Sequence, residues 1–500
     1  MSSDIQRKMG HGALWMVLFK FTERSLGLIS TLILVHVLSP IDFGITAMAG
    51  SFILMTEMLT AFSFDVALIQ KQDATDEHYH SAWTCNVLLG LAITVLMLAA
   101  ATWIADFYKH PELYWVVCAL ALGPLISGSE NIGVVAFRKD MRFRREFAFQ
   151  LSRKVIGVLV VVPLAFYLRN YWALVAGVLA SKLVGTITSY LVHPFRPHLS
   201  LIKVRGLLGF SKWLLVNNFV NFLKERSSDF VIGRLLGAVP LGVYNISYEI
   251  ALMPTSELSA PINRALLPGF SRIAHDSDAI RAAYRSAVGI LALIAVPVAF
   301  GIYAVAPHLI PTLLGPKWLA AVPLIEILAF NGGLQLLQSS ICTVIIASGR
   351  PDRVTKTNGV YVLTLLSLFA LLVPSYGLSG AAYGVLVTSI LSTPIYLSQL
   401  RRSVGVTPSV FLGAAARPVV AALAMALLVR WVLPEWTPAL DLAVSIGWTI
   451  GGVTLGVFAY AAAIMLLWLA AGRPAGAERL VFEGLRQRFL KRGAAPASIS

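Results

Sequence analysis

Apolar runs of about the 20 residues that cross a lipid bilayer recur from one end of this chain to the other. Hydrophobic residues make up 57% of the 500 residues and charged residues only 13%, whereas soluble domains average about 25% charged residues. The sequence therefore predicts an all-α polytopic membrane protein of about fourteen transmembrane helices. The expected spans are 12–36, 41–69, 79–105, 113–137, 151–168, 170–190, 207–232, 241–267, 284–306, 319–347, 355–374, 376–399, 409–432 and 445–471.

The distribution of basic residues predicts the orientation of these spans. With the N-terminus inside, 28 of the 40 Lys and Arg residues fall in cytoplasmic segments and 5 in exterior loops, as the positive-inside bias requires. We therefore expect an inner-membrane protein with both termini in the cytoplasm. This bias also explains the net charge of +15, so no nucleic-acid partner is expected. The most basic loop, 138–154, is interpreted as a topology determinant, with contact to anionic lipid headgroups as the alternative.

The chain lacks the usual signatures of catalysis. Cys85, Cys118 and Cys342 stand singly inside apolar runs, and neither a GxxxxGK[ST] loop, an HExxH pair nor a GxSxG turn occurs. The largest exterior loop, 307–318, is too short to hold an acceptor site and catalytic groups. We expect a transporter that has no metal or organic cofactor, and not an enzyme.

The two halves of the chain resemble each other in sequence. Trp15 and Trp213 are 198 residues apart, and so are the motifs Leu38-x4-Phe43-Gly44 and Leu236-x4-Leu241-Gly242. Each half would contain six spans, so the halves share one orientation, and a site between them is expected. The predicted segments are an N-terminal lobe at 1–192, a cytoplasmic linker at 193–206, a C-terminal lobe at 207–403, two additional helices at 404–472 and a cytoplasmic basic amphipathic tail at 473–500.

Charged residues within the spans are the strongest functional signal, because a charge at bilayer depth usually faces a cavity or a partner. Their helical spacing places Lys20, Glu23 and Arg24 on one face of the first span. The seventh span, its counterpart in the repeat, carries a similar stripe, which consists of Asn217, Asn221, Lys224 and Glu225. We expect both faces to line a substrate cavity. The alternative is that they only hold helices or lobes together.

Further polar residues lie in the second and eighth spans. Asn245 and Glu249 share one face of the eighth span, and Asn245 is expected to meet sugar hydroxyls. Together with Glu57 and Asp65 of the second span, Glu249 could take up H⁺ or Na⁺ and couple transport to a cation gradient. Three isolated charges are expected to form structural pairs or to lie at the membrane interface, with a functional role as the alternative: Glu130, Lys182 and Glu326.

Seven short motifs occur in order, at regular places among the spans: Leu38-Ser-Pro-Ile-Asp42-Phe43-Gly44, Val66-Ala-Leu-Ile-Gln70-Lys71, Ile104-Ala-Asp-Phe107-Tyr108, Ile232-Gly-Arg234-Leu-Leu-Gly237, Leu241-Gly-Val-Tyr244, Leu314-Gly315-Pro-Lys-Trp318 and Ala347-Ser-Gly349-Arg350 followed by Asp352. In this respect residues 5–430 resemble the bacterial polysaccharide-biosynthesis flippases of the multidrug/oligosaccharidyl-lipid/polysaccharide exporter superfamily. The likeness is strongest to the subgroup of colanic acid and succinoglycan exporters.

The resemblance implies two six-helix lobes in a V shape around a central cavity, lined by the first, second, seventh and eighth spans. It implies that the substrate is an undecaprenyl-diphosphate-linked oligosaccharide, flipped from the cytoplasmic to the periplasmic leaflet for exopolysaccharide or lipopolysaccharide assembly. Arg24 corresponds to a basic residue that related lipid II flippases use. The implied partners are this substrate, membrane lipids and the polysaccharide polymerase and export machinery. The alternatives are a cation-coupled exporter of drugs or small molecules and a membrane polysaccharide transferase or ligase.

Overall fold

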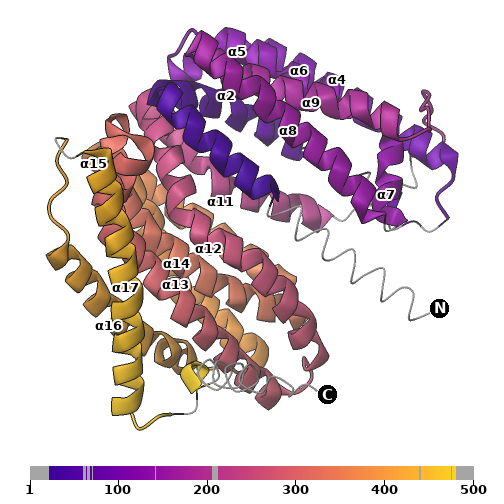
Figure 1. Cartoon of the computed structure of the whole chain (residues 1–500). Coiled ribbons are helices and arrows are strands. Elements are labelled where there is room, and N and C mark those ends of the chain that lie inside the picture. Colours follow the sequence, from indigo (N-terminus) through magenta and orange to yellow (C-terminus); the bar gives the residue numbers. More distant parts are fainter. Residues whose placement is uncertain are drawn as a thin grey trace, which may run out of the picture. The chain divides into compact units, whose positions relative to one another are not determined.

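The computed structural model describes residues 22–59, 64, 68, 69, 71, 73–140, 142–204, 212–438, 441–474 and 476–479. Within these residues the secondary structure is helical, and no strand occurs (Figure 1). The chain divides into two compact units, Met1–Asn245 and Ile246–Ser500. The predicted lobes end elsewhere, at the linker 193–206, and that division by repeats stays a prediction.

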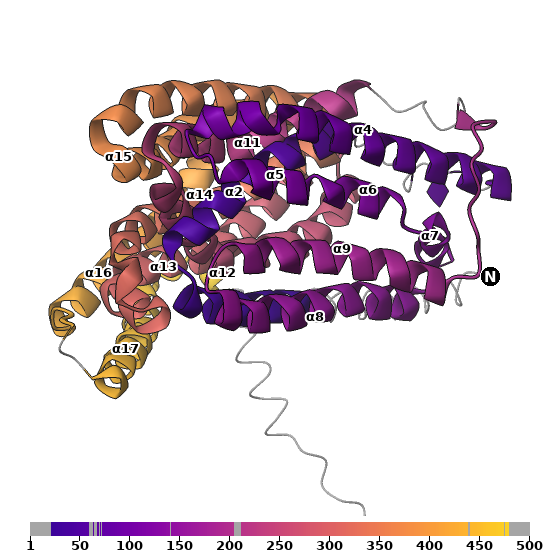
Figure 2. The same cartoon turned by 90° about the horizontal axis from the view of Figure 1, so that it is seen from above.

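The described part of the first unit starts with a helix over 22–37, which is followed by helices of different lengths. These are α2 (Pro40–Leu59), α4 (Asp76–Tyr108), α5 (Leu113–Leu120), α6 (Leu122–Gly128), η1 (Ile132–Val134), α7 (Val135–Lys139), α8 (Phe143–Leu168), α9 (Trp172–Val192), α11 (Lys212–Leu236) and the first turns of α12 (Ala238–Arg272). Helices α8 and α9 lie side by side, as Figures 1 and 2 show. Helix α11 packs against α2 and therefore belongs with this unit.

The expected fourth span, 113–137, is broken. Helices α5 and α6 form one limb, and η1 with α7 forms another that is inclined by 62° to it. The break falls at Asn131, whose backbone is extended and whose side-chain carbonyl caps the amide of Gly133. Nδ2 of the Asn131 side chain donates to the carbonyl oxygen of Phe195 at 2.7 Å, so the break is fixed by a contact distant in sequence.

The segment that follows α9 runs in an extended form past α7 to the first turns of α4 (Figure 2). The amide of His198 donates to Nδ1 of His80 at 3.1 Å, and the two rings stack at a centroid distance of 3.5 Å. The amide of Ser200 donates to Thr84 Oγ1 at 2.9 Å. The described part of the predicted linker, 193–204, is therefore tied to the first unit by its main chain.

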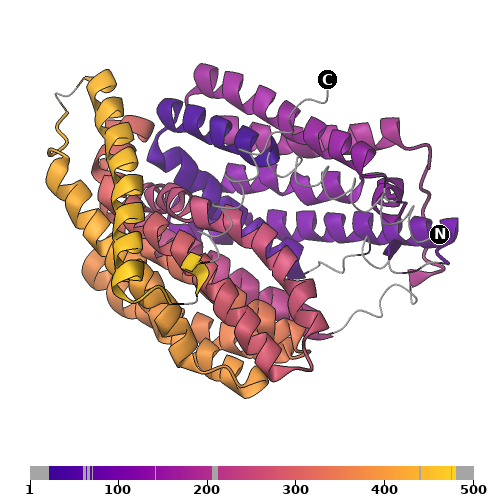
Figure 3. The same ribbon diagram turned by 60° about the horizontal axis from the view of Figure 1, so that its bottom comes forward.

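The second unit consists of the rest of α12 with α13 (Ser277–Leu314), η2 (Pro316–Ala321), α14 (Val322–Ala347), α15 (Pro351–Val404), α16 (Pro408–Val432) and α17 (Leu442–Ala470). Its core lies where α13 packs on α14 and α16 and contains Tyr284, Leu291, Ile341 and Tyr396. Helices α16 and α17 run side by side (Figures 1 and 3). Helix α12 continues through Pro254 and Pro261 as one helix.

Helix α15 is two helices that meet at Gly377, where φ is +57° and ψ is −134°. This break lies at the boundary between the predicted spans 355–374 and 376–399, and it brings both outer ends of α15 to the same end of the unit. Among the described residues, nine helices are long and apolar enough to cross a membrane, or ten when a bent pair counts as one span. The predicted fold class is confirmed, whereas the total of fourteen spans stays a prediction.

Candidate substrate-binding site

The charged cluster of the first helix is only partly described, because Lys20 lies outside the described residues. Glu23 and Arg24 are half-buried. One turn further along, a Cβ atom on Gly27 would lie 3.7 Å from Nζ of Lys154. Lys154 belongs to α8, whose first turns are formed by residues that the sequence assigned to a loop. The structure therefore adds a cation from another helix beside the face that carries Glu23 and Arg24.

Helix α11 is positioned by aromatic packing against α2 and α4. Phe52 of α2 is buried and makes edge-to-face contacts with Phe230 of α11 at 5.0 Å and with Trp103 of α4 at 5.7 Å between ring centroids. Such pairs stabilise a helix interface beyond the area that they bury. This packing fixes the rotation of α11 and so decides which of its polar residues stay accessible.

The predicted polar stripe of α11 keeps accessible surface. Asn217, Asn221 and Lys224 are half-buried, and Glu225 is exposed. Like Arg24, these residues therefore keep part of their surface accessible. Their assignment as substrate-binding residues stays a prediction.

Asn245 has a different environment. Its side chain hydrogen-bonds Asp229, which is 3% exposed and forms an ion pair with Arg226 at 3.4 Å. Beside this group, the hydroxyls of Ser228 and Tyr244 are 3.4 Å apart. Asn245 therefore supports a buried carboxylate, and its expected contact with sugar hydroxyls stays a prediction.

A second buried hydroxyl pair lies nearby on α2 and α4. Ser51 Oγ is 3.1 Å from the hydroxyl of Tyr108. The ring of Tyr108 in turn fills the space that a side chain at Gly233 of α11 would occupy. Sequence periodicity predicted the polar stripe of α11 but not these two hydroxyl pairs, because the two hydroxyls of each pair come from different helices.

The three isolated charges are paired, as predicted. Lys182 Nζ lies 2.9 Å from Glu57 Oε1, and Arg153 Nη1 lies 3.1 Å from Glu130 Oε2. Glu57, a candidate for cation coupling, thus has a basic partner on α9. Of the other coupling candidates, Glu249 is exposed on α12 and Asp65 lies outside the described residues.

The third pair joins α14 to α16. Arg430 forms an ion pair with Glu326, donates a hydrogen bond to the carbonyl oxygen of Tyr303 at 2.8 Å and stacks over the Tyr303 ring at 4.4 Å. The first of the two predicted additional helices, α16, therefore adds three contacts of one arginine to its packing on α13. A guanidinium suits such a site because its planar fork can donate and stack together.

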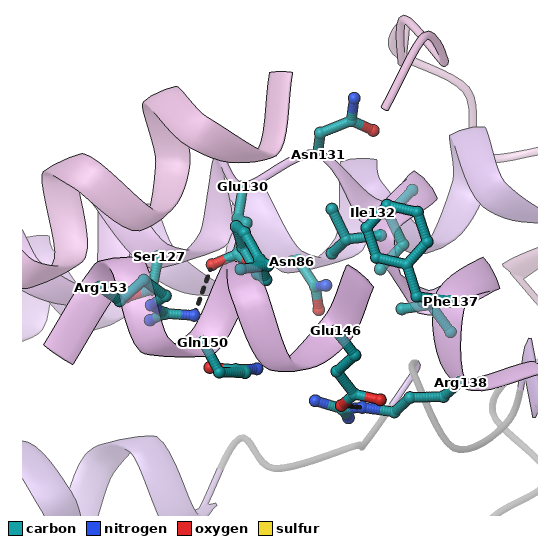
Figure 4. A pocket seen from close by; sticks show the side chains of 13 residues that line it. Asn86, Ser127, Glu130, Asn131, Ile132, Phe137, Arg138, Glu146, Gln150 and Arg153 are labelled. Atoms are coloured by element: carbon teal, nitrogen blue, oxygen red, sulfur yellow. Dashed lines mark hydrogen bonds and ion pairs between the residues drawn. The ribbon is translucent and has the colours of Figure 1, made fainter. Parts of the chain in front are cut away.

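The first unit also holds a polar cavity of about 180 Å³ between α4, α6, α7 and α8 (Figure 4). Two ion pairs cross it, Arg153 with Glu130 and Arg138 with Glu146, and Gln150 points between them. Its four charges cancel, so it suits a neutral polar group better than an anion. The cavity is remote in sequence from the predicted site residues. No group of metal-ligating side chains is found in the described part of the chain.

His193 packs against α7 and does not line this cavity. The ring of His193 packs on Phe137 at 5.7 Å, and its Nδ1 accepts a hydrogen bond from the amide of Phe195 at 3.2 Å. Burial, together with the positive charges of Arg142 and Arg196, lowers the pKa of His193 below its usual value. The neutral ring therefore holds the start of the linker.

Comparison with known proteins identifies the chain. The model of a family described as polysaccharide biosynthesis protein matches residues 33–323, more than half of the chain. The protein belongs to this family. The succinoglycan biosynthesis transport protein ExoT of Rhizobium meliloti is 26% identical over 466 residues, which cover 90% of this chain and 92% of that protein. The lipopolysaccharide biosynthesis protein WzxC of Escherichia coli is 24% identical, over 78% of this chain and 80% of its own length.

Solved structures bear out the fold of this family member. The lipid II flippase MurJ in an inward closed conformation superposes with a TM-score of 0.73 over 92% of this chain and 100% of that chain, at 13% identity. An inward-facing multidrug resistance MATE transporter of the MOP superfamily superposes with a TM-score of 0.54, over 76% of this chain and 94% of that chain, at 16% identity. These likenesses show that the chain shares the fold of these two transporters, and the family match confirms the predicted family resemblance.

Proposed function

We propose that the protein is a flippase that moves undecaprenyl-diphosphate-linked oligosaccharides from the cytoplasmic to the periplasmic leaflet of the bacterial inner membrane. The family match over 33–323 carries the proposal, supported by relatives named for the biosynthesis or transport of exported polysaccharides. Such a protein is a transporter and not an enzyme. It would supply the polymerase and export machinery of polysaccharide assembly.

The accessible charged residues of the first unit have suitable chemistry for such a substrate. In this proposal Arg24 and Lys154 attract the diphosphate, because charge-assisted hydrogen bonds to phosphate are the strongest that side chains offer. The amides of Asn217 and Asn221 and the charged pair Lys224 and Glu225 contact the saccharide. Directional movement then requires that the inward and outward states differ in affinity for the substrate.

Coupling to H⁺ or Na⁺ would use acids of the first and second units. The ion pair between Glu57 and Lys182 supports this idea for Glu57, because a cation bound at the carboxylate would release Lys182 and so change the contact between α2 and α9. In proteoliposomes, the Glu57→Gln variant should then lose the dependence of translocation on an imposed gradient. Basal translocation without a gradient should persist.

The decisive experiment measures the leaflet distribution of lipid-linked repeat units in a bacterial strain that lacks this gene. A membrane-impermeant glycosidase applied to spheroplasts cleaves only units in the outer leaflet. We expect protected units to accumulate, and re-expression of the gene should restore cleavage. Normal distribution with intact polymer would overturn the proposal.

Two other outcomes identify the competing functions. A small-molecule exporter would change drug susceptibility and leave the surface polysaccharide intact. A transferase or ligase would show turnover of a lipid-linked donor by the purified protein in detergent. Translocation in proteoliposomes without any covalent change of the lipid-linked substrate separates a flippase from both.

A further inference from the structure

A basic pocket lies in the second unit, where the two outer ends of α15 meet. Its volume is about 420 Å³, within the range of about 300–1,000 Å³ typical of small-molecule sites. Both ends of the 54-residue helix contribute to it because the chain reverses at Gly377. The lining residues are Arg350, Asp352, Arg353, Lys356, Gln399 and Arg402.

The positive charge of the pocket exceeds what the protein itself neutralises. Four cations stand against one carboxylate, Asp352, which lies 3.7 Å from Nζ of Lys356. Arg350 and Arg402 are exposed and have no ion-pair partner in the described part of the chain. By contrast, the cavity between α7 and α8 of the first unit opposes each arginine with a glutamate. The second unit therefore holds an excess of cations that an anion can complete.

The pocket is built by defined backbone geometry. Helix α14 ends in a turn in which Gly349 takes φ +74° and the amide of Arg350 donates to the carbonyl oxygen of Ile345 at 3.1 Å. Nη1 of Arg353 donates to Ser403 Oγ at 2.9 Å, which joins the start of α15 to its end. Arg350, just before α15, and Arg402, on its last turn, thus both line the pocket.

An apolar stripe continues from the pocket along α15. Lys356, Val360 and Leu363 are spaced by four and three residues and lie on one face of this helix. The side chains of Val360 and Leu363 are 42% and 68% exposed. A ligand with a phosphate head and a hydrocarbon tail fits both parts, whereas a soluble phosphate would use only the cations.

We infer that this pocket binds the phosphate headgroup of an acidic phospholipid, whose acyl chain lies along α15. The positive-inside bias places this end of α15 at the cytoplasmic leaflet, where basic pockets between membrane helices bind anionic headgroups. The inference does not depend on which substrate the protein moves. Failure of the flippase proposal would leave it intact.

The test uses the full chain, purified in detergent and titrated with phosphatidylglycerol, phosphatidylcholine or glycerol 3-phosphate while its melting temperature is followed. Phosphatidylglycerol should raise the Tm of the wild type, and the other two additives should not. In the double variant Arg350→Gln with Arg402→Gln, the apparent affinity for phosphatidylglycerol should fall about tenfold or more, because two charge-assisted hydrogen bonds are lost.

A matched control removes the same charge from outside the pocket. The double variant Arg401→Gln with Arg473→Gln loses two exposed cations that do not line the pocket, one on the last turn of α15 beside Arg402 and one after the end of α17, and should keep wild-type affinity within about twofold. Equal loss in both variants would show general surface attraction and overturn the inference. So would equal stabilisation by glycerol 3-phosphate, which would assign the pocket to a soluble phosphate, or by phosphatidylcholine.

Native mass spectrometry of the wild type gives a second measurement that needs no variant. After exposure to an equimolar mixture of the two lipids, the protein should retain phosphatidylglycerol in preference to phosphatidylcholine. Retention of both in equal amounts would contradict the assignment even if the double variant failed to fold.

Discussion

Gly44 and Gly242, 198 residues apart in the internal repeat, each face the backbone of the other's helix. A Cβ atom on Gly44 would overlap the carbonyl oxygen of Ala238, and one on Gly242 would overlap that of Pro40. Pro40 and Ala238 are separated by the same 198 residues. The first turns of α2 and α12 therefore cross in a reciprocal contact, as expected for repeats that share one orientation.

This crossing predicts that Gly44→Ala and Gly242→Ala each destabilise the protein. The added methyl group meets main-chain atoms that cannot rotate away, and overpacking of this kind costs about 1–3 kcal/mol. Thermal unfolding of the purified protein in detergent should show a lower Tm for both variants.

Gly50→Ala is the matched control, since Gly50 lies on α2 and a Cβ there meets nothing within 4 Å. Its Tm should equal that of the wild type or exceed it, because alanine favours helices. An equal fall in all three variants would show that the close crossing is not what makes Gly44 and Gly242 sensitive.

The ion pair between Glu57 and Lys182 predicts an asymmetric response to mutation. Lys182→Met leaves a half-buried carboxylate without its cation, and we expect a loss of about 2 kcal/mol. Glu57→Gln should cost less, because the lysine stem is flexible enough to carry its ammonium group to another polar region.

The double variant Lys182→Met with Glu57→Leu tests the pairing itself. It should recover most of the stability lost in Lys182→Met, because an apolar pair replaces the ion pair without leaving a charge behind. Additive losses of Tm in the double variant would contradict the pairing.

Hydropathy predicted the helices that depend on local sequence alone. The ranges of α4, α9, α16 and α17 lie within a few residues of the expected spans, because a run that is apolar on all sides needs no partner to specify it. The broken fourth span could not be predicted, since Asn131 takes its extended backbone from a contact with Phe195, 64 residues away. Nor could the early start of α8, whose first turns are basic.

For the candidate site, the sequence predicted which residues share a helix face but not their partners on other helices. Helical spacing placed Asn217, Asn221 and Lys224 on one accessible face, which the structure retains. The spacing on one helix says nothing about partners on another. It therefore missed that Lys154 approaches the first helix and that Asn245 supports Asp229.

The lowered pKa of His193 predicts that acid destabilises the first unit. Because the pKa in the folded state lies below the unfolded value of about 6.5, the unfolded chain binds more protons under mildly acidic conditions. The stability contributed by His193 is complete above about pH 6.5 and is lost as the pH falls towards the folded pKa. Protonation of Nδ1 would also abolish its hydrogen bond from Phe195.

The Tm of the wild type should therefore fall between pH 7.5 and 5.5, and His193→Gln should reduce the slope. His275→Gln, at an exposed position of the second unit, is the control and should leave the slope unchanged. The explanation fails if the His193 variant keeps the full wild-type slope.

The position of Lys154 beside the first helix predicts that it acts together with Arg24 on the diphosphate. Arg24→Ala and Lys154→Gln should each lower translocation of a lipid-linked oligosaccharide in proteoliposomes by about tenfold, the effect of one lost charge-assisted hydrogen bond. Arg24→Lys should restore part of the activity, because it keeps the charge but not the fork of the guanidinium. Arg144→Gln, at an exposed position of the same helix α8, controls for general charge and should translocate normally. Full activity of Arg24→Ala at wild-type expression would remove Arg24 from the site. Equal losses of translocation in Lys154→Gln and Arg144→Gln would show that Lys154 acts through surface charge and not through its contact with the first helix.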